Sequence, residues 1–129
     1  MDNIRILRRI TERDNRYRLE AYLFVLEALF HTRRMFKKEK HASGHELLEG
    51  IKDLALNRYG SMAKIVFEHW GIKETLDFGY IVFNMVDENV LSKTTDDKLS
   101  DFEKVFDFTE VFERSYRINV GDQHRSKSC

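Results

Sequence analysis

The sequence has no proline and a single cysteine, and each scarcity removes a class of structure. One cysteine cannot form an intramolecular disulfide, so a disulfide framework within the chain is excluded. Cys129 lies in the polar segment GDQHRSKSC, which lacks the fixed positive surroundings that activate a thiol, so a catalytic cysteine is not expected. Without proline, helix ends depend on glycine, asparagine and capping side chains.

Long apolar runs are also missing from the sequence. The longest, such as AYLFVL and YIVF, fall far short of the roughly 20 residues that a membrane-spanning helix needs, and MDNIRILRRI has no signal-peptide core. The sequence therefore predicts a cytoplasmic protein with no membrane association. At 129 residues the chain has the size of one domain, which we expect over residues 1–116, followed by a polar, flexible tail over residues 117–129.

The net charge is zero, yet the charges are unevenly distributed. Residues 1–40 contain 11 Lys and Arg against 6 Asp and Glu, whereas residues 74–116 contain 4 against 11. One interpretation is that the basic N-terminal helices face the acidic C-terminal half, within a monomer or across a dimer. The other is that the two regions form solvated faces of opposite sign.

Two helices are expected in the N-terminal third. Ile4, Leu7 and Ile10 predict a short amphipathic helix that ends near Asp14. From residue 16 a longer helix begins, and its broad apolar stripe predicts that most of it is buried. The stripe comprises Leu19, Tyr22, Leu23, Leu26, Leu29 and Phe30.

Three more helices are predicted in the centre of the chain. The first begins at Ser43, whose spacing to the following glutamate is that of a capping box, and it ends at Gly60. Ser61 is the expected cap of the second helix, which stops at Gly71. Thr75 is the expected cap of the third.

After residue 89 the periodicity changes from helical to alternating. Residues 90–93 and the run FEKVFDF over residues 102–108 predict two strands around a polar turn. Thr109 is then the expected cap of a last short helix. The predicted fold is α+β and mainly helical, with a winged-helix-like three-helix centre, a C-terminal β-hairpin and two additional N-terminal helices.

A helix-turn-helix followed by a wing raises the question of DNA binding. A reading helix contacts bases near its N-terminus, usually through Arg, Lys, Asn or Gln. Residues 75–91 contain no Lys or Arg, so this face would repel phosphates. The acidic residues predict a protein-partner face instead, made of Asp77, Asp87, Glu88, Asp96, Asp97 and Asp101.

The triplet DFG at residues 77–79 does not indicate a kinase, because the glycine-rich loop, strand lysine and catalytic loop of that family are missing. Asp77 is expected as an acid in the first turn of a helix, and Gly79 as a position of close packing.

Three residues are weak candidates for a metal site: His41, His45 and Glu49. His45 and Glu49 would share one helical face and could bind zinc together with His41 from the preceding loop. The spacing is permissive rather than diagnostic, and ordinary surface and loop positions explain it equally. Motifs such as a phosphate-binding loop, CxxC, GxSxG and HExxH are missing, so no catalytic residue or cofactor is predicted and an enzyme ranks third among the functions considered.

Several blocks of the sequence together resemble a family of small, uncharacterised bacterial proteins. The blocks are RYRLEAYLFVLEAL, HASGHELLEGIKDLAL, YGSMAKIVFEHWGI, TLDFGYIVFNMVDENVLSKTTDD and DFEKVFDF, and the resemblance extends from about Arg16 to Phe112. Relatives often have proline where this chain has Ser61, which affects the expected loop detail and not the core. The resemblance implies no activity and no catalytic residues.

The predicted function is that of a non-catalytic interaction or regulatory module, acting through a protein partner or self-association. The alternative is a nucleic-acid-binding, winged-helix-like regulator that uses the basic N-terminal helices. Its candidate anion-binding residues are Arg5, Arg8, Arg9, Arg13, Arg16 and Arg18.

Overall fold

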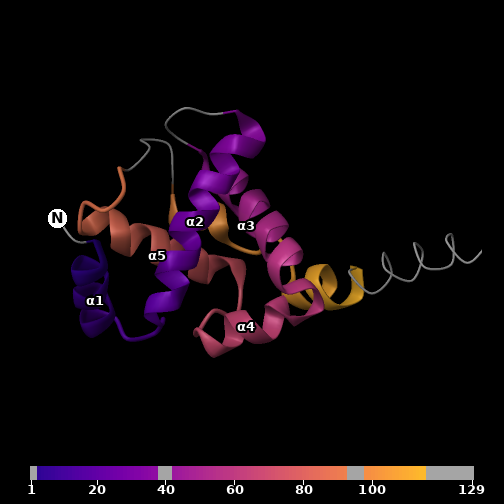
Figure 1. The fold of residues 1–129 in the computed structure, drawn as a ribbon, viewed down its shortest axis with the longest axis horizontal. Helices are drawn as coiled ribbons and strands as arrows, with labels where there is room; N and C mark the ends of the chain where they lie inside the picture. The colour runs from indigo at the N-terminus through magenta and orange to yellow at the C-terminus, as the bar shows by residue number, and fades with distance from the viewer. Residues whose placement is uncertain (1–2, 38–41, 93–97, 116–129) are drawn as a thin grey trace, which may run out of the picture.

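The chain folds as a bundle of helices in the computed structural model, which describes residues 3–37, 42–92 and 98–115 (Figure 1). Five α-helices are present in these residues: α1 (Asn3–Arg13), α2 (Leu19–Phe36), α3 (Gly44–Tyr59), α4 (Ala63–His69) and α5 (Thr75–Asp87). Two 3-10 turns (Gly60–Met62 and Leu99–Phe102) and a π-helical turn (Thr109–Ser115) complete the described part. The helices α2 and α3 run side by side, and α1 and α5 pack against α2.

The predicted α+β fold is wrong, because the described residues form only helices and turns. Val90 and Leu91, expected in the first strand, instead bond their backbone N–H groups to the Met85 carbonyl at the end of α5. Lys104, in the second predicted strand, has a left-handed φ of 49°, which interrupts an extended chain. Part of the predicted turn, residues 93–97, lies outside the described residues, as does the predicted tail. Without a hairpin the described chain has no wing.

Residues 98–108, here called the strap, cross the bundle as an irregular segment. The buried Thr75 hydroxyl donates to the Phe102 carbonyl (2.6 Å) and accepts from the Val105 N–H (3.1 Å). These backbone groups would be paired with a neighbouring strand in a hairpin, and here one side chain of α5 satisfies both. Thr75 was predicted as a helix cap, but the cap is Glu74, and Thr75 fastens the strap instead.

The side chain of Phe102 lies between α3 and α5 at two glycines. A Cβ atom at Gly44 would stand 3.0 Å from the ring, and one at Gly79 would stand 2.9 Å from it. Both distances are shorter than ordinary carbon–carbon contacts, so the ring fits only because neither position has a side chain. The prediction that Gly79 is a position of close packing is confirmed.

An aromatic cluster around Phe67 forms the centre of the core. Phe67 is fully buried, and its ring centroid lies 5.2–6.0 Å from five other rings. These are Phe24 of α2, Trp70 after α4, Phe78 of α5, Phe108 at the end of the strap and Phe112 in the π-helical turn. Of the aromatic residues that suggested an alternating strand, Phe102 and Phe108 are buried among the helices and Phe106 is half-buried. Tilted and edge-on ring pairs of this kind add to the energy of burial.

Helices α2 and α3 approach each other closely at Thr32 and Gly50. A Cβ atom at Gly50 would overlap the Thr32 hydroxyl oxygen, and that hydroxyl is fully buried and donates to the Ala28 carbonyl (2.7 Å). At the rim of the same contact, His31 Nε2 lies 2.7 Å from Asp53 Oδ2. Glycine at position 50 is therefore required for the two longest helices of the described part to pack.

The predicted helix boundaries have mixed outcomes. The capping box is confirmed: Glu46 N–H donates to Ser43 Oγ (3.1 Å) and Ser43 N–H donates to Glu46 Oε1 (2.9 Å). Gly60 and Gly71 have positive φ angles of 55° and 92°, as expected of helix ends. The predicted caps Ser61 and Thr109 are wrong: α4 follows Met62 with no side-chain cap, and Asp107 Oδ2 accepts the Glu110 N–H (2.9 Å).

None of the helices in the described residues combines the length and the hydropathy that a membrane crossing requires.

Substitution of Gly50 by alanine tests the contact between α2 and α3. We expect Gly50→Ala to lower the free energy of unfolding by about 1–3 kcal/mol, because the methyl group overlaps Thr32 and the helices must separate. Urea unfolding would measure it. The matched control is Glu49→Ala on the exposed side of the same helix, with an expected change below about 0.5 kcal/mol. Equal stability of the two variants would contradict the packing argument.

Substitution of Thr75 by valine tests the attachment of the strap. Valine has nearly the shape of threonine, but it leaves the Phe102 carbonyl and the Val105 N–H unpaired, so we expect a loss of about 1–3 kcal/mol. Amide hydrogen exchange at Val105 should also become faster. Thr11→Val is the control, because the Thr11 hydroxyl bonds only locally to the Arg8 carbonyl. Unchanged exchange at Val105 would show that other contacts hold the strap.

Candidate interaction surface

Asp77, the first residue of the predicted acidic face, has intramolecular partners. Its carboxylate accepts the backbone N–H groups of Lys73 (2.8 Å) and Glu74 (3.2 Å) before α5. It also accepts the hydroxyl of Tyr17 (2.5 Å), and burial together with this hydrogen bond raises the pKa of Tyr17. Asp77 is thus an acid at the helix N-terminus, as expected. Through its hydrogen bond with Tyr17, it also attaches the loop that precedes α2 to helix α5.

Glu88, at the other end of α5, faces the arginines of α1. Its carboxylate lies 3.5 Å from the guanidinium of Arg9 and 3.7 Å from that of Arg13. A carboxylate next to a helix C-terminus meets the partial negative charge of the last carbonyls, so the two arginines offset an unfavourable position. Because the arginine side chains are 63% and 46% exposed, the pairs contribute little to stability.

The other members of the predicted acidic face do not extend it. Asp101 Oδ2 accepts the Lys98 N–H (3.0 Å) and so caps the 3-10 turn at the start of the strap. Asp87 is exposed at the end of α5, and Asp96 and Asp97 lie outside the described residues. Among the described acids of this set, the structure therefore gives Asp77, Glu88 and Asp101 intramolecular roles.

Asp14 and Arg16 form a polar centre in the loop between α1 and α2. Arg16 donates to both carboxylate oxygens of Asp14 (2.9 and 2.7 Å), and its guanidinium lies 4.3 Å from the ring centroid of Tyr80. The amide of Asn84 donates to Asp14 (2.9 Å) and to the hydroxyl of Tyr22 (3.0 Å). The Arg16 guanidinium holds the pKa of the Asp14 carboxyl well below its usual range, and Arg16 is occupied within the chain.

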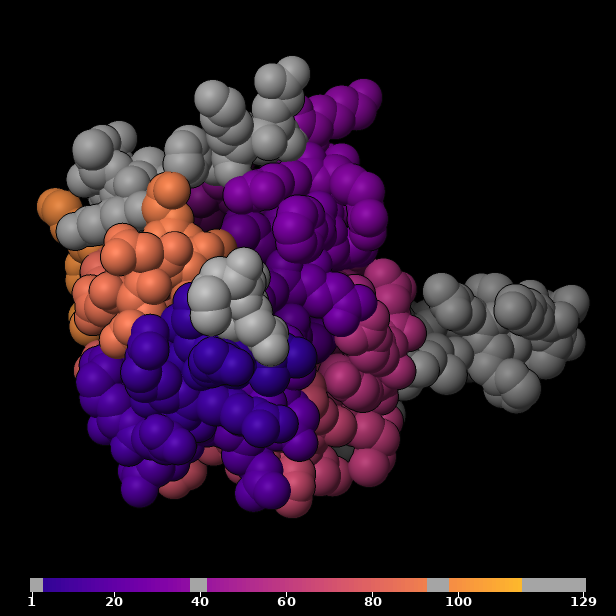
Figure 2. Space-filling view, turned by 60° about the vertical axis from the view of Figure 1, so that its left-hand side comes forward, coloured from indigo at the N-terminus to yellow at the C-terminus, as the bar shows by residue number. Residues whose placement is uncertain are grey.

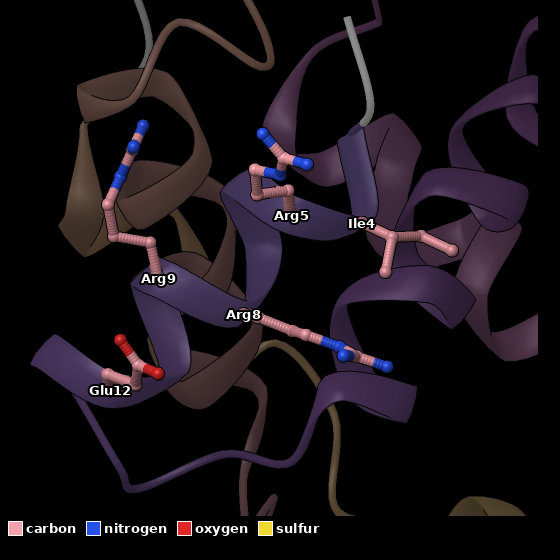
Figure 3. A pocket seen from close by; sticks show the side chains of 5 residues that line it. All are labelled: Ile4, Arg5, Arg8, Arg9 and Glu12. Atoms are coloured by element: carbon pink, nitrogen blue, oxygen red, sulfur yellow. The ribbon is translucent and has the colours of Figure 1, made fainter.

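The remaining predicted arginines differ in their availability. Arg5, Arg8 and Arg18 are exposed, whereas Arg9 and Arg13 extend toward Glu88. A hollow of about 560 Å³ lies over α1, and its described lining includes Ile4, Arg5, Arg8, Arg9 and Glu12. Figure 3 shows that these side chains spread outward and do not converge on one point. Such an arrangement suits a broad contact with another surface better than it suits a small ligand.

The outer side of α2 is apolar, and sequence analysis missed this. Leu23 and Phe30 were predicted in the buried stripe, but they are 40% and 60% exposed. The helix is apolar nearly all round, so the sequence could not show which side faces the core. The core side is occupied by Ala21, Tyr22, Phe24, Val25, Ala28 and Thr32.

The exposed apolar residues Leu23 and Phe30 lie on one side of α2. Leu19 and Leu26, on the same side of α2 as Leu23 and Phe30, are only partly buried. Figure 2 shows α1 (indigo) and part of α2 (violet) on one face of the molecule. Ile4 of α1, 43% exposed, extends toward α2 together with Arg8 (Figure 3). We name the stripe of these α2 residues, together with the neighbouring Ile4, Arg5 and Arg8, the α1–α2 face.

The candidate metal ligands do not form a site in the described residues. His45 and Glu49 lie on α3, where His45 is exposed and Glu49 pairs with Lys52 at 3.1 Å. His41 lies outside the described residues. No group of three or more histidine, cysteine or acidic side chains within residues 3–37, 42–92 and 98–115 has a geometry that could hold a metal ion.

Comparisons of the chain with protein-family models, with curated proteins and with solved structures find no match. The family resemblance of the sequence blocks therefore stays a prediction.

Substitution of Asp14 by asparagine should reveal the paired carboxylate through the pH dependence of stability. The folded protein lowers the pKa of Asp14, so the charged form stabilises the fold above the unfolded pKa of about 3.9, and this contribution is lost as pH falls toward the folded pKa. The stability difference between the native chain and Asp14→Asn should therefore be largest near neutral pH and shrink below about pH 4.

Urea unfolding at several pH values between about 7 and 3 would measure this difference. Asp87→Asn at the exposed end of α5 is the matched control. We expect it to change the free energy of unfolding by less than about 0.5 kcal/mol at every pH. A difference for Asp14→Asn that is the same at every pH would show that the lost hydrogen bonds, and not the charge, are responsible.

Proposed function

We propose that this protein is a non-catalytic protein-interaction module that docks its partner on the α1–α2 face. The observation that supports this most strongly is the exposure of Leu23 and Phe30 on the outer side of a helix whose core side is already filled. Single apolar residues are common on protein surfaces, but a stripe of them along one helix is typical of a contact surface. Covering a largely exposed phenylalanine contributes about 25 cal/mol for each Å² removed from water.

The charges around the stripe add specificity to this proposal. Arg5 and Arg8 are exposed beside apolar residues, and arginine and phenylalanine are both enriched at the centres of protein interfaces. The predicted acidic face offers weaker support, since Asp77, Glu88 and Asp101 already bind groups of the same chain. The proposal therefore keeps the predicted class of function and moves the docking surface to the N-terminal helices.

A second candidate is nucleic-acid binding through the basic residues of the N-terminal helices. Its support is the exposure of Arg5, Arg8 and Arg18, which could neutralise phosphates. This function would make no use of Leu23 or Phe30. Retention on heparin that is lost in the double variant Arg5→Glu, Arg8→Glu and kept in Leu23→Ser would favour this candidate over the first.

A photo-crosslinking amino acid at position 30 tests the docking proposal in the cell of origin. We expect a discrete heavier protein band after irradiation, one that resists nuclease treatment and disappears when Leu23→Ser is added. Position 65 on α4 is the matched control, because Ile65 is 51% exposed and lies outside the α1–α2 face. The proposal fails when position 30 gives no product, or when positions 30 and 65 give the same products.

A further inference from the structure

The apolar stripe on α2 has the spacing of a helix-pairing seam. Leu19, Leu23, Leu26 and Phe30 are four, three and four residues apart, which is the a/d pattern of a coiled coil. A seam of this period keeps facing one partner helix along its whole length and favours a crossing angle near 20°. From Leu19 to Phe30 the seam is about 17 Å long at 1.5 Å per residue. The spacing therefore points to an occupant that is a helix of similar length.

The seam ends at an arginine whose hydrogen bonding is incomplete. Arg33 follows Phe30 at the next seam position, and its guanidinium lies 5.6 Å from the Phe30 ring centroid. Its Nε atom is buried and has no hydrogen-bond acceptor among the described residues. Because the residue as a whole is only half-buried, a carboxylate of a docked partner could pair with this guanidinium at a nitrogen other than the buried Nε.

Positive charge also borders the seam along α1. Arg8 extends toward α2, and Arg5 lies one turn before it on the outer side of α1 (Figure 3). On the opposite border, the carboxylate of Glu27 is bound by both terminal nitrogens of Arg58, which neutralises it. A helix that binds to the seam therefore meets Arg8 on the α1 side and Arg33 at the C-terminal end of the seam. The acid on the opposite border, Glu27, is already paired with Arg58.

We propose that the occupant is an acidic amphipathic helix of another protein, with leucine-like residues at its a and d positions and carboxylates beside them. This inference rests on the proposed function and names the chemistry of the partner. The carboxylates would pair with Arg8 and Arg33, and the apolar residues would cover Leu23 and Phe30. A helix of this length is marginal alone in water, so such a segment becomes helical on docking.

A second copy of this chain fits the seam less well. When two identical helices pair antiparallel about a two-fold axis, each border of the seam meets the same border of the other copy. The arginines of α1 would then face the arginines of the other α1, and like charges at an interface are unfavourable. Charge complementarity therefore favours an acidic partner over self-association through this face.

A pair of matched synthetic peptides tests the inference. Each has about 15 residues, enough to cover the seam, with leucine at the a and d positions; one has glutamate at the flanking positions and the other has lysine. Fluorescence anisotropy with the full-length protein would measure the affinities. We expect the glutamate peptide to bind at least about tenfold more tightly than the lysine peptide, and to gain helical circular dichroism on binding.

Variants of the protein then separate the contribution of the apolar seam to peptide binding from the contribution of the charges. Phe30→Ser should weaken binding of the glutamate peptide by about tenfold or more, since this residue is the largest exposed group of the seam. Arg8→Glu should weaken binding of the glutamate peptide and strengthen binding of the lysine peptide. Loss of folding would weaken binding of both peptides and so cannot produce this result. Ile65→Ser on α4 is the control and should change neither affinity.

Several outcomes would overturn the inference. They are equal affinity for the two peptides, an unchanged affinity in Phe30→Ser, or a dimer in sedimentation that Phe30→Ser dissociates, which would assign the seam to a second copy. When position 30 crosslinks to a protein but neither peptide binds, the docking function stands and the acidic partner is wrong. When the crosslinking also fails, the proposed function itself is wrong.

Discussion

The ring of Phe102 fills a gap between α3 and α5 that exists only because both helices have glycine there. The same residue offers its carbonyl to the buried hydroxyl of Thr75, so its side chain and its backbone are fixed together. This double attachment holds the strap across the bundle and brings Phe108 and Phe112 against Phe67. The C-terminal part of the described chain thereby becomes part of the core.

The opposite charges of the two ends of the chain meet within one molecule. Glu88 at the end of α5 faces Arg9 and Arg13 of α1. Asp14, whose charge is paired by the neighbouring Arg16, also accepts a hydrogen bond from the uncharged amide of Asn84 on α5. Of the interpretations that the sequence leaves open, contact within the monomer is the one that these distances support. Arg5 and Arg8 of α1 are exposed, and Arg8 extends toward α2 (Figure 3).

Local features of the fold could be predicted from the sequence, and contacts between distant segments could not. The Ser43 capping box and the end of the same helix at Gly60 depend on neighbouring residues, and both predictions are confirmed. The hairpin prediction is wrong because alternating aromatic residues suit a strand and an irregular strap equally, and contacts with the distant Thr75, Gly44 and Gly79 decide between them. The exposure of Phe30 was missed for a related reason: α2 is apolar on two sides, and the choice of the buried side depends on α3 through Gly50.

The N-terminal helix serves the core and the candidate docking face at once. Leu7 and Ile10 are fully buried, and the loop that follows α1 supplies one of the two acceptors of the Asn84 amide. A shortened chain that began at α2 would uncover apolar surface and leave that amide half satisfied. Substitutions on α1 that leave the fold intact are therefore confined to its outward positions, such as Arg5 and Arg8, while its inward positions are constrained by the core.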